Sequence, residues 1–345
     1  DAVGGDMNAY TTKEYTAFYV RTLARDIDLG LDILSDIFWN PALRKDEVDS
    51  ERQVILEEVL MHRDEPADVV QERFAEACFP NHPLGREVLG DPKVITNVTV
   101  EAIRAFLTEH YRPPNVVVAV AGAIEHDQIA DCIERRFSGI PGGAAPGRTA
   151  PSNAVKRLDV TSRETEQAHV VVGVRAIDCR SPRRYALSLL NHILGGGISS
   201  RLFQSIREER GLAYSVISDR IAFADSGALA ISVGTAPERV HEVLELVGEE
   251  LDTLTAKGVS EDELERAKGH VHADTWLGLE DSGTRMSRIA SGLLLLDEVL
   301  PVDEQLHRVD AVSLDDVAEL SSELLSSDRV CAVIGPFEES DFSLV

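Results

Sequence analysis

The sequence predicts an α+β fold of two repeated domains, each a mainly antiparallel sheet backed by helices, with the first domain truncated at its N-terminus. Residues 6–23 alternate polar with apolar or aromatic side chains, a pattern typical of two strands. Helical patterns follow at about 26–38, 44–63, 66–78 and 99–110. The same order of patterns recurs in the second half of the 345-residue chain. A repeated strand-then-helix order favours two α+β domains.

The first half ends in a strand, a helix and a linker. The segment PPNVVVAVAG at residues 113–122 predicts a buried strand entered through prolines, and residues 126–137 predict a helix. Residues 140–153 are rich in Gly, Pro and Ala, as expected of a linker. We therefore expect domains at 1–140 and 153–345, joined by residues 141–152. Asn97-Val98-Thr99 fits a glycosylation sequon, but Thr99 is better placed as a helix N-cap.

The second half is predicted from residue 156 onward. Strands are expected at about 156–161, 167–175, 212–223, 226–235 and 329–335, and helices at about 182–194, 199–209, 237–256, 260–277, 280–295 and 313–325. Three glycines at residues 195–197 predict a tight turn between two helices, and no Lys-Ser/Thr follows to make them a phosphate loop.

The repeat also aligns single residues and suggests what is absent. In the simplest register Glu58 falls opposite Asp274, and Glu51 falls opposite Ala267. If the halves are built alike, roughly 60 residues are missing before residue 1. By this analogy they would include a strand and a helix matching residues 167–194.

The amino-acid composition limits the classes of molecule that the chain is expected to bind. The chain has 34 Lys plus Arg against 60 Asp plus Glu, a formal net charge of −26, which argues against nucleic acids and anionic membranes. A cationic peptide would be attracted, although the acidity could equally serve solubility. The four cysteines are widely spaced with no CxxC, and no apolar stretch approaches the ~20 residues of a membrane span. A reducing cytoplasm fits best.

Glu51 and Glu58 stand out on the helix predicted at 44–63. A spacing of seven places both carboxylates on one side of a helix, with Val54 and Ile55 beside them. Carboxylates among apolar residues are costly to desolvate unless a cation or a shared proton compensates them, which would suit a metal or acid/base site. The alternative is that the helix is partly exposed and both glutamates reach water.

Five segments resemble the pitrilysin/insulinase (M16) superfamily of zinc peptidases, in its branch of mitochondrial processing peptidase and bacterial relatives. They are GGDMNAYTTKEYTAFYV at the front, ERQVILEE at 51–58, HPLGREVLG at 82–90, LGGGISSRLFQSIREERGLAYSV at 194–216 and LERAKGHV at 264–271. The five occur in the family's order, and the resemblance covers essentially the whole chain.

The resemblance implies a zinc ion held by two histidines of an HxxEH motif and by a glutamate further on. Glu58 would be that zinc ligand, and Glu51 an accessory catalytic acid. HxxEH does not occur in this sequence. The other ligands are thus expected upstream of residue 1, and this chain alone is expected to be inactive.

The resemblance also implies peptide contacts from both halves. Asn8 and Ala9 match the family's exposed edge strand, on which an extended peptide pairs by main-chain hydrogen bonds. Arg207 and Tyr214 match residues that reach the substrate from the second domain. Without the resemblance, Arg207 would be a surface ion-pairing residue and Tyr214 a half-buried strand residue.

Together these features predict a cytoplasmic zinc-dependent endopeptidase that cleaves extended or unfolded peptides. The resemblance to the family also implies that the protein is a homodimer. The alternative is a non-catalytic partner or core subunit of the same family that binds peptides or stabilises an assembly.

Overall fold

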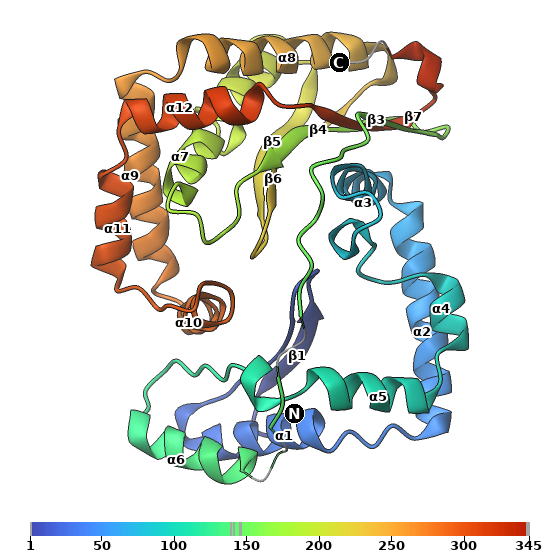
Figure 1. Cartoon of the computed structure of the whole chain (residues 1–345), viewed down its shortest axis with the longest axis vertical. Helices are drawn as coiled ribbons and strands as arrows, with labels where there is room; N and C mark the ends of the chain where they lie inside the picture. Colours follow the sequence, from blue (N-terminus) through green and yellow to red (C-terminus); the bar gives the residue numbers. More distant parts are fainter. Residues whose placement is uncertain (1, 139, 141, 145–146, 343–345) are drawn as a thin grey trace. The chain divides into compact units, whose positions relative to one another are not determined.

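The computed structural model describes residues 2–138, 140, 142–144 and 147–342, and the chain forms two compact units (Figure 1). Unit 1 comprises Asp1–Leu60, Glu87–Thr149 and Leu277–Val299. Unit 2 comprises Met61–Arg86, Ala150–Trp276 and Leu300–Val345. The predicted α+β fold with mainly antiparallel sheets is confirmed. The predicted boundaries at residues 140 and 153 remain a prediction.

Unit 1 contains a two-stranded antiparallel sheet and several helices. Strand β1 (Asp6–Thr11) pairs with β2 (Thr16–Arg21), as the alternating pattern predicted. The helices are α1 (Ile27–Trp39), α2 (Lys45–Asp64, whose last turn enters unit 2), α4 (Pro92–Asn97), α5 (Val100–His110), α6 (His126–Phe137) and α10 (Ser282–Leu296).

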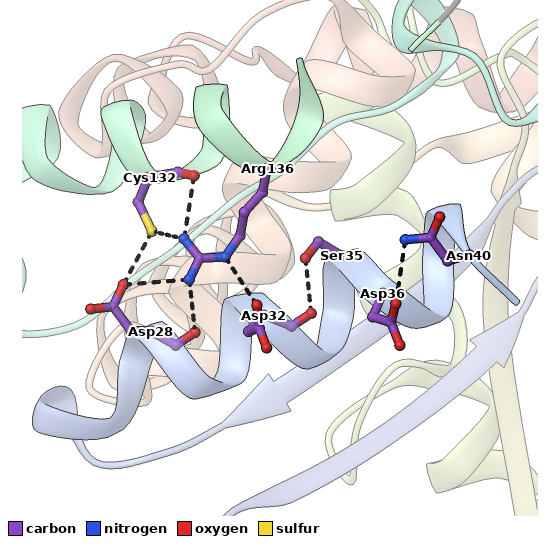
Figure 2. A network of polar contacts seen from close by, with 7 residues as sticks. All are labelled: Asp28, Asp32, Ser35, Asp36, Asn40, Cys132 and Arg136. Carbon is purple, nitrogen blue, oxygen red and sulfur yellow. Dashed lines mark hydrogen bonds and ion pairs between the residues drawn. The ribbon is translucent and has the colours of Figure 1, made fainter. Parts of the chain in front are cut away.

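Helix α6 is joined to α1 by a polar network (Figure 2). The buried thiol of Cys132 donates to Asp28 Oδ1 at 3.2 Å. The Arg136 guanidinium lies 3.9 Å from Asp28 Oδ1 and 3.8 Å from Asp32 Oδ1. Burial is the main cause that raises the pKa of Cys132, so the thiol remains a neutral hydrogen-bond donor. The network therefore orients α6 on α1.

Unit 2 is built around a five-stranded sheet in the order β3-β7-β4-β6-β5. The strands are β3 (Leu158–Ser162), β4 (Ala168–Ala176), β5 (Ala213–Ala222), β6 (Gly227–Thr235) and β7 (Val330–Gly335). Only the β3–β7 pair is parallel. The helices are α3 (Pro66–Cys78), α7 (Arg184–Gly195), a π-helix η4 (Phe203–Glu208), α8 (Val240–Lys257), α9 (Glu261–Gly278, whose end enters unit 1), α11 (Val302–Asp310) and α12 (Leu314–Leu325).

Apolar side chains cover both faces of this sheet. Val170 and Val172 of β4 face the core formed with α7, α8 and α12, whereas Val171 faces a second cluster that contains Val70 and Phe74 of α3. Because successive strand residues point to opposite faces, a sheet covered on both sides reads as a nearly continuous apolar segment. Both clusters lie in unit 2, which gives this unit a rigid scaffold.

The order of elements repeats between the halves. The series β1, β2, α1, α2, α3, α4, α5 matches β5, β6, α8, α9, α10, α11, α12. Helices α4 and α11, which the sequence analysis missed, fall at equivalent places. The third helix of each half belongs to the unit formed mostly by the other half, since α3 lies in unit 2 and α10 in unit 1.

One predicted strand is wrong. Residues 113–115 form a 3-10 turn, Val116 that follows is extended, and residues 116–120 belong to no strand. A strand requires hydrogen-bonded neighbours, and no strand of the described residues pairs with this segment. The β-branched composition therefore indicated extended backbone correctly but did not supply a partner.

Four smaller predictions concern the Thr99 helix cap, the linker, the cysteines and membrane-spanning helices. Thr99 caps α5, because its Oγ1 accepts from the Ala102 N–H at 3.2 Å. The predicted linker contains residues 141 and 145–146, which lie outside the described residues, and its described remainder forms neither helix nor strand. All four cysteines are free thiols. Among the described helices, none has both the length and the hydrophobicity that a membrane span requires.

Candidate functional site

The glutamate pair lies on the exposed side of α2. Glu51 and Glu58 are both exposed, Val54 beside them is 49% exposed, and Ile55 is half-buried. The predicted apolar surroundings are therefore wrong in this structure, and the alternative in which both carboxylates reach water describes it. Two turns of α-helix separate the glutamates, so their side chains leave the same face about 10 Å apart along the axis.

Asn8 and Ala9 lie on β1, whose six residues are all exposed. Within the described residues β1 pairs with β2 alone, so its other edge is open. The Ala9 N–H donates to Asn8 Oδ1 at 2.8 Å. An open strand edge with such a locally satisfied N–H is a surface on which another extended segment can pair.

Arg207 and Tyr214 lie together in unit 2. The Arg207 guanidinium carbon is 4.7 Å from the centroid of the Tyr214 ring and 4.7 Å from that of Phe203. Tyr214 is 81% exposed, and 35% of the Arg207 side chain is exposed. The sequence analysis selected Arg207 and Tyr214 but missed Phe203. Its spacing of four from Arg207 on a helix was the available signal.

Local backbone features produce this arrangement. Helix η4 ends just before Gly211, which adopts φ +61°, a conformation that glycine favours at a helix C-terminus. The β5–β6 register then shifts between Ala213 and Ser215, which leaves Tyr214 as the extra residue of a bulge. The bulge turns the Tyr214 ring out of the sheet towards Arg207.

The described residues do not form a complete metal site. No group of three or more His, Cys, Asp or Glu side chains among them could hold a metal ion. The rings of His192 and His270 stack with their centroids 4.0 Å apart. Burial and the neighbouring His270 lower the pKa of His192, so this ring tends to be neutral.

The structure therefore brings predicted residues together within each unit. Arg207 and Tyr214 are in contact in unit 2, and Glu51 and Glu58 share a helix face in unit 1. Asn8 and Ala9 lie on a strand of unit 1. Each set is positioned by its own unit.

The repeated order of strands and helices defines an α+β protein built from two related halves. Comparison with known families agrees. The model for insulinase, peptidase family M16, matches residues 1–92, and the model for the peptidase M16 inactive domain matches residues 97–270. The chain belongs to the M16 peptidase family.

Relatives and solved structures extend this result. An uncharacterized zinc protease of Streptomyces coelicolor is 40% identical, over 99% of this chain and 76% of its own length. The crystal structure of a peptidase M16 inactive domain from Pseudomonas fluorescens has a TM-score of 0.90 at 20% identity, covering 98% of this chain and 82% of that one. A chain of complex III2 from Candida albicans has a TM-score of 0.88 at 21% identity, covering 99% and 84%. The two structures show that the fold is shared.

Proposed function

We propose that this chain is part of a zinc-dependent endopeptidase that cleaves extended or unfolded peptides. The contact of Arg207 with Tyr214 carries the proposal, because it presents a cation and a phenol hydroxyl from one exposed surface. Such groups can donate hydrogen bonds to peptide carbonyl oxygens. The family and the zinc-protease names of its relatives support the same activity.

The substrate would bind along β1. Its open edge would accept an extended peptide, and the Ala9 N–H would exchange its bond with Asn8 for a peptide carbonyl. Main-chain pairing reads the backbone more than the sequence, so broad selectivity is expected.

Residues 1–345 do not hold zinc by themselves under this proposal. Glu58 would supply one ligand and Glu51 a neighbouring carboxylate, while the histidines would come from an HxxEH segment outside residues 1–345. The zinc-protease names of the relatives support a zinc site for the family, and HxxEH does not occur in residues 1–345. Because the described ligands are incomplete, residues 1–345 alone should not cleave peptides.

The first test compares Glu58→Gln with Glu57→Gln in a form of the protein that includes an HxxEH segment. Both residues are exposed on α2, but only Glu58 is the proposed ligand. Glu58→Gln should lose stoichiometric zinc and cleavage of an unfolded peptide, and Glu57→Gln should keep both. Zinc is measured by atomic spectrometry. Full zinc content and cleavage in Glu58→Gln would place the ligand elsewhere.

Arg207→Ala tests the substrate contact in the same protein. It should lower kcat/KM for an unfolded peptide by roughly tenfold or more, because a charged hydrogen-bond donor to the substrate is lost. Zinc content should stay unchanged, and loss of zinc would contradict the assignment of Arg207 to substrate.

A non-catalytic subunit is the second candidate. The match of residues 97–270 to the model for the peptidase M16 inactive domain favours it. In that case neither zinc nor cleavage would appear in any longer form of the protein, while peptide binding at β1 and Arg207 would persist.

A further inference from the structure

The guanidinium carbon of Arg207 lies over two aromatic rings. It is 4.7 Å from the ring centroid of Phe203 and 4.7 Å from that of Tyr214. Its ion pair with Glu208 is loose, at 4.0 Å. Aromatic contact therefore dominates the surroundings of this cation, because rings attract a guanidinium through their negatively polarised faces.

The two rings are anchored differently. Phe203 is half-buried and packs against the main core of unit 2, so its ring is fixed from beneath. Tyr214 is 81% exposed and stands on a bulge of β5. Phe203 is thus the rigid member of the aromatic pair, and Tyr214 is the member that a ligand can also touch.

An aromatic ring packed against a guanidinium determines which of its N–H groups can still donate a hydrogen bond to a ligand. Rings that approach the planar faces leave the N–H groups in the plane free to donate sideways. An unrestrained arginine side chain would lose about 2 kcal/mol of rotamer entropy when it binds a ligand. Holding the side chain before binding reduces that loss, which is how preorganisation raises affinity.

We propose that Phe203 is a positioning residue that fixes Arg207 for hydrogen bonding to a carbonyl oxygen of an extended peptide. The peptide part of this inference rests on the proposed function. The fixing of Arg207 does not, because it concerns contacts within unit 2. Phe203 itself acts through Arg207.

Nuclear magnetic resonance of residues 1–345 tests the fixing directly. The Nε–Hε signal of Arg207, assigned by its loss in Arg207→Lys, should lie at an unusual shift because two ring currents act on it. Phe203→Leu should move that signal towards the value of a solvent-exposed arginine, and Phe203→Tyr should not. Phe337→Leu is the matched control, since Phe337 packs on the same core without a contact to Arg207. An unchanged Arg207 signal in Phe203→Leu would overturn the inference.

Peptide affinity tests the consequence. The probe is a fluorescent, uncharged eight-residue peptide, and its Kd is measured by anisotropy with residues 1–345. Phe203→Leu should raise the Kd roughly fivefold, the size expected from the loss of a cation–π contact. Phe203→Tyr keeps an aromatic ring and should leave the Kd of the unmodified protein unchanged. In the Arg207→Ala background, Phe203→Leu should cause no further loss. A merely structural role would instead weaken binding equally in both backgrounds.

The outcomes separate the two proposals. If Arg207→Ala weakens binding but Phe203→Leu does not, the positioning role is overturned and the proposed function stands. If Arg207→Ala leaves binding unchanged, the proposed peptide site and the peptide part of this inference both fail, and the resonance shift alone decides whether Phe203 fixes Arg207.

Discussion

At the residue scale, Glu263 of α9 forms an ion pair with Arg201, which lies just before η4. Arg201 donates from Nε to Glu263 Oε1 at 2.7 Å and from Nη2 to Oε2 at 2.9 Å. The Ser260 N–H also donates to Oε2 at 2.8 Å, which caps α9. The hydrogen bonds from Arg201 are the main cause that lowers the pKa of Glu263 from 4.5 to about 2.

Glu263→Gln should therefore lower the free energy of unfolding at pH 7 by about 2 kcal/mol, since charged hydrogen bonds and a cap are lost. A carboxyl whose pKa is depressed by folding stabilises the protein above its unfolded pKa. That stability disappears as the pH falls from about 4.5 towards 2. The variant should show a shallower loss of stability across this window in urea titrations.

The control for this prediction is Glu265→Gln on the same helix. The Glu265 carboxylate is 66% exposed and lies 3.4 Å from Lys268 Nζ. Because water already solvates this carboxylate, its ion pair should contribute only about 0–1 kcal/mol. Equal destabilisation by Glu263→Gln and Glu265→Gln would contradict the assigned role of the Arg201 pair.

At the scale of elements, α3 packs onto the sheet of unit 2 at a glycine. A Cβ on Gly173 would lie 2.7 Å from Phe74 Cζ and 2.1 Å from the Leu229 carbonyl oxygen. Phe74 is fully buried in the cluster formed by α3 and the sheet. Gly173→Ala should therefore separate α3 from β4 and cost about 1–3 kcal/mol, the usual range for overpacking.

Gly269→Ala is the matched control, because no atom lies within 4 Å of its added Cβ and the residue is within α9. This change should stabilise by about 0.5–1 kcal/mol through helix propensity. Both values are measured as free energies of unfolding in urea. A Gly173→Ala variant as stable as the unmodified protein would show that α3 does not press on β4.

The same element shows how far the sequence could predict the fold. Val70, Phe74 and Cys78 recur at helical spacing, which indicates both α3 and its buried face. The pattern carries no information about which sheet that face meets, so the placement of α3 in unit 2 could not be predicted. Residues 116–120 were predicted as a strand for the same reason: composition is local, whereas strand pairing is not.

The candidate site has the same division between local and non-local information. Spacing placed Glu51 and Glu58 on one face of α2, but exposure depends on what packs against that face, and both reach solvent. Phe203 was missed because its role is a contact with the Arg207 guanidinium, and helical spacing alone does not show that the two side chains meet.

At the scale of the whole molecule, charge is the dominant property. The formal net charge of −26 creates a negative potential that attracts cations and repels anions. We expect the association rate of a basic peptide with residues 1–345 to exceed that of an acidic one by roughly tenfold at low salt, and both rates to converge at high salt as charges are screened. Stopped-flow fluorescence measures both rates at 20 mM salt, where the Debye length is roughly 20 Å, and at 500 mM salt, where it is roughly 4 Å.

Three peptides of equal length are needed to separate the effect of charge on the association rate from the effect of main-chain pairing. They share one backbone and differ only in having Lys, Glu or Ser at the same exposed positions, so main-chain pairing to β1 is held constant while charge changes. Faster association of the Lys peptide at low salt, with the Ser peptide between the other two, is expected because steering acts on the encounter and not on the pairing. Equal rates for all three would mean that the acidity serves solubility instead of substrate attraction.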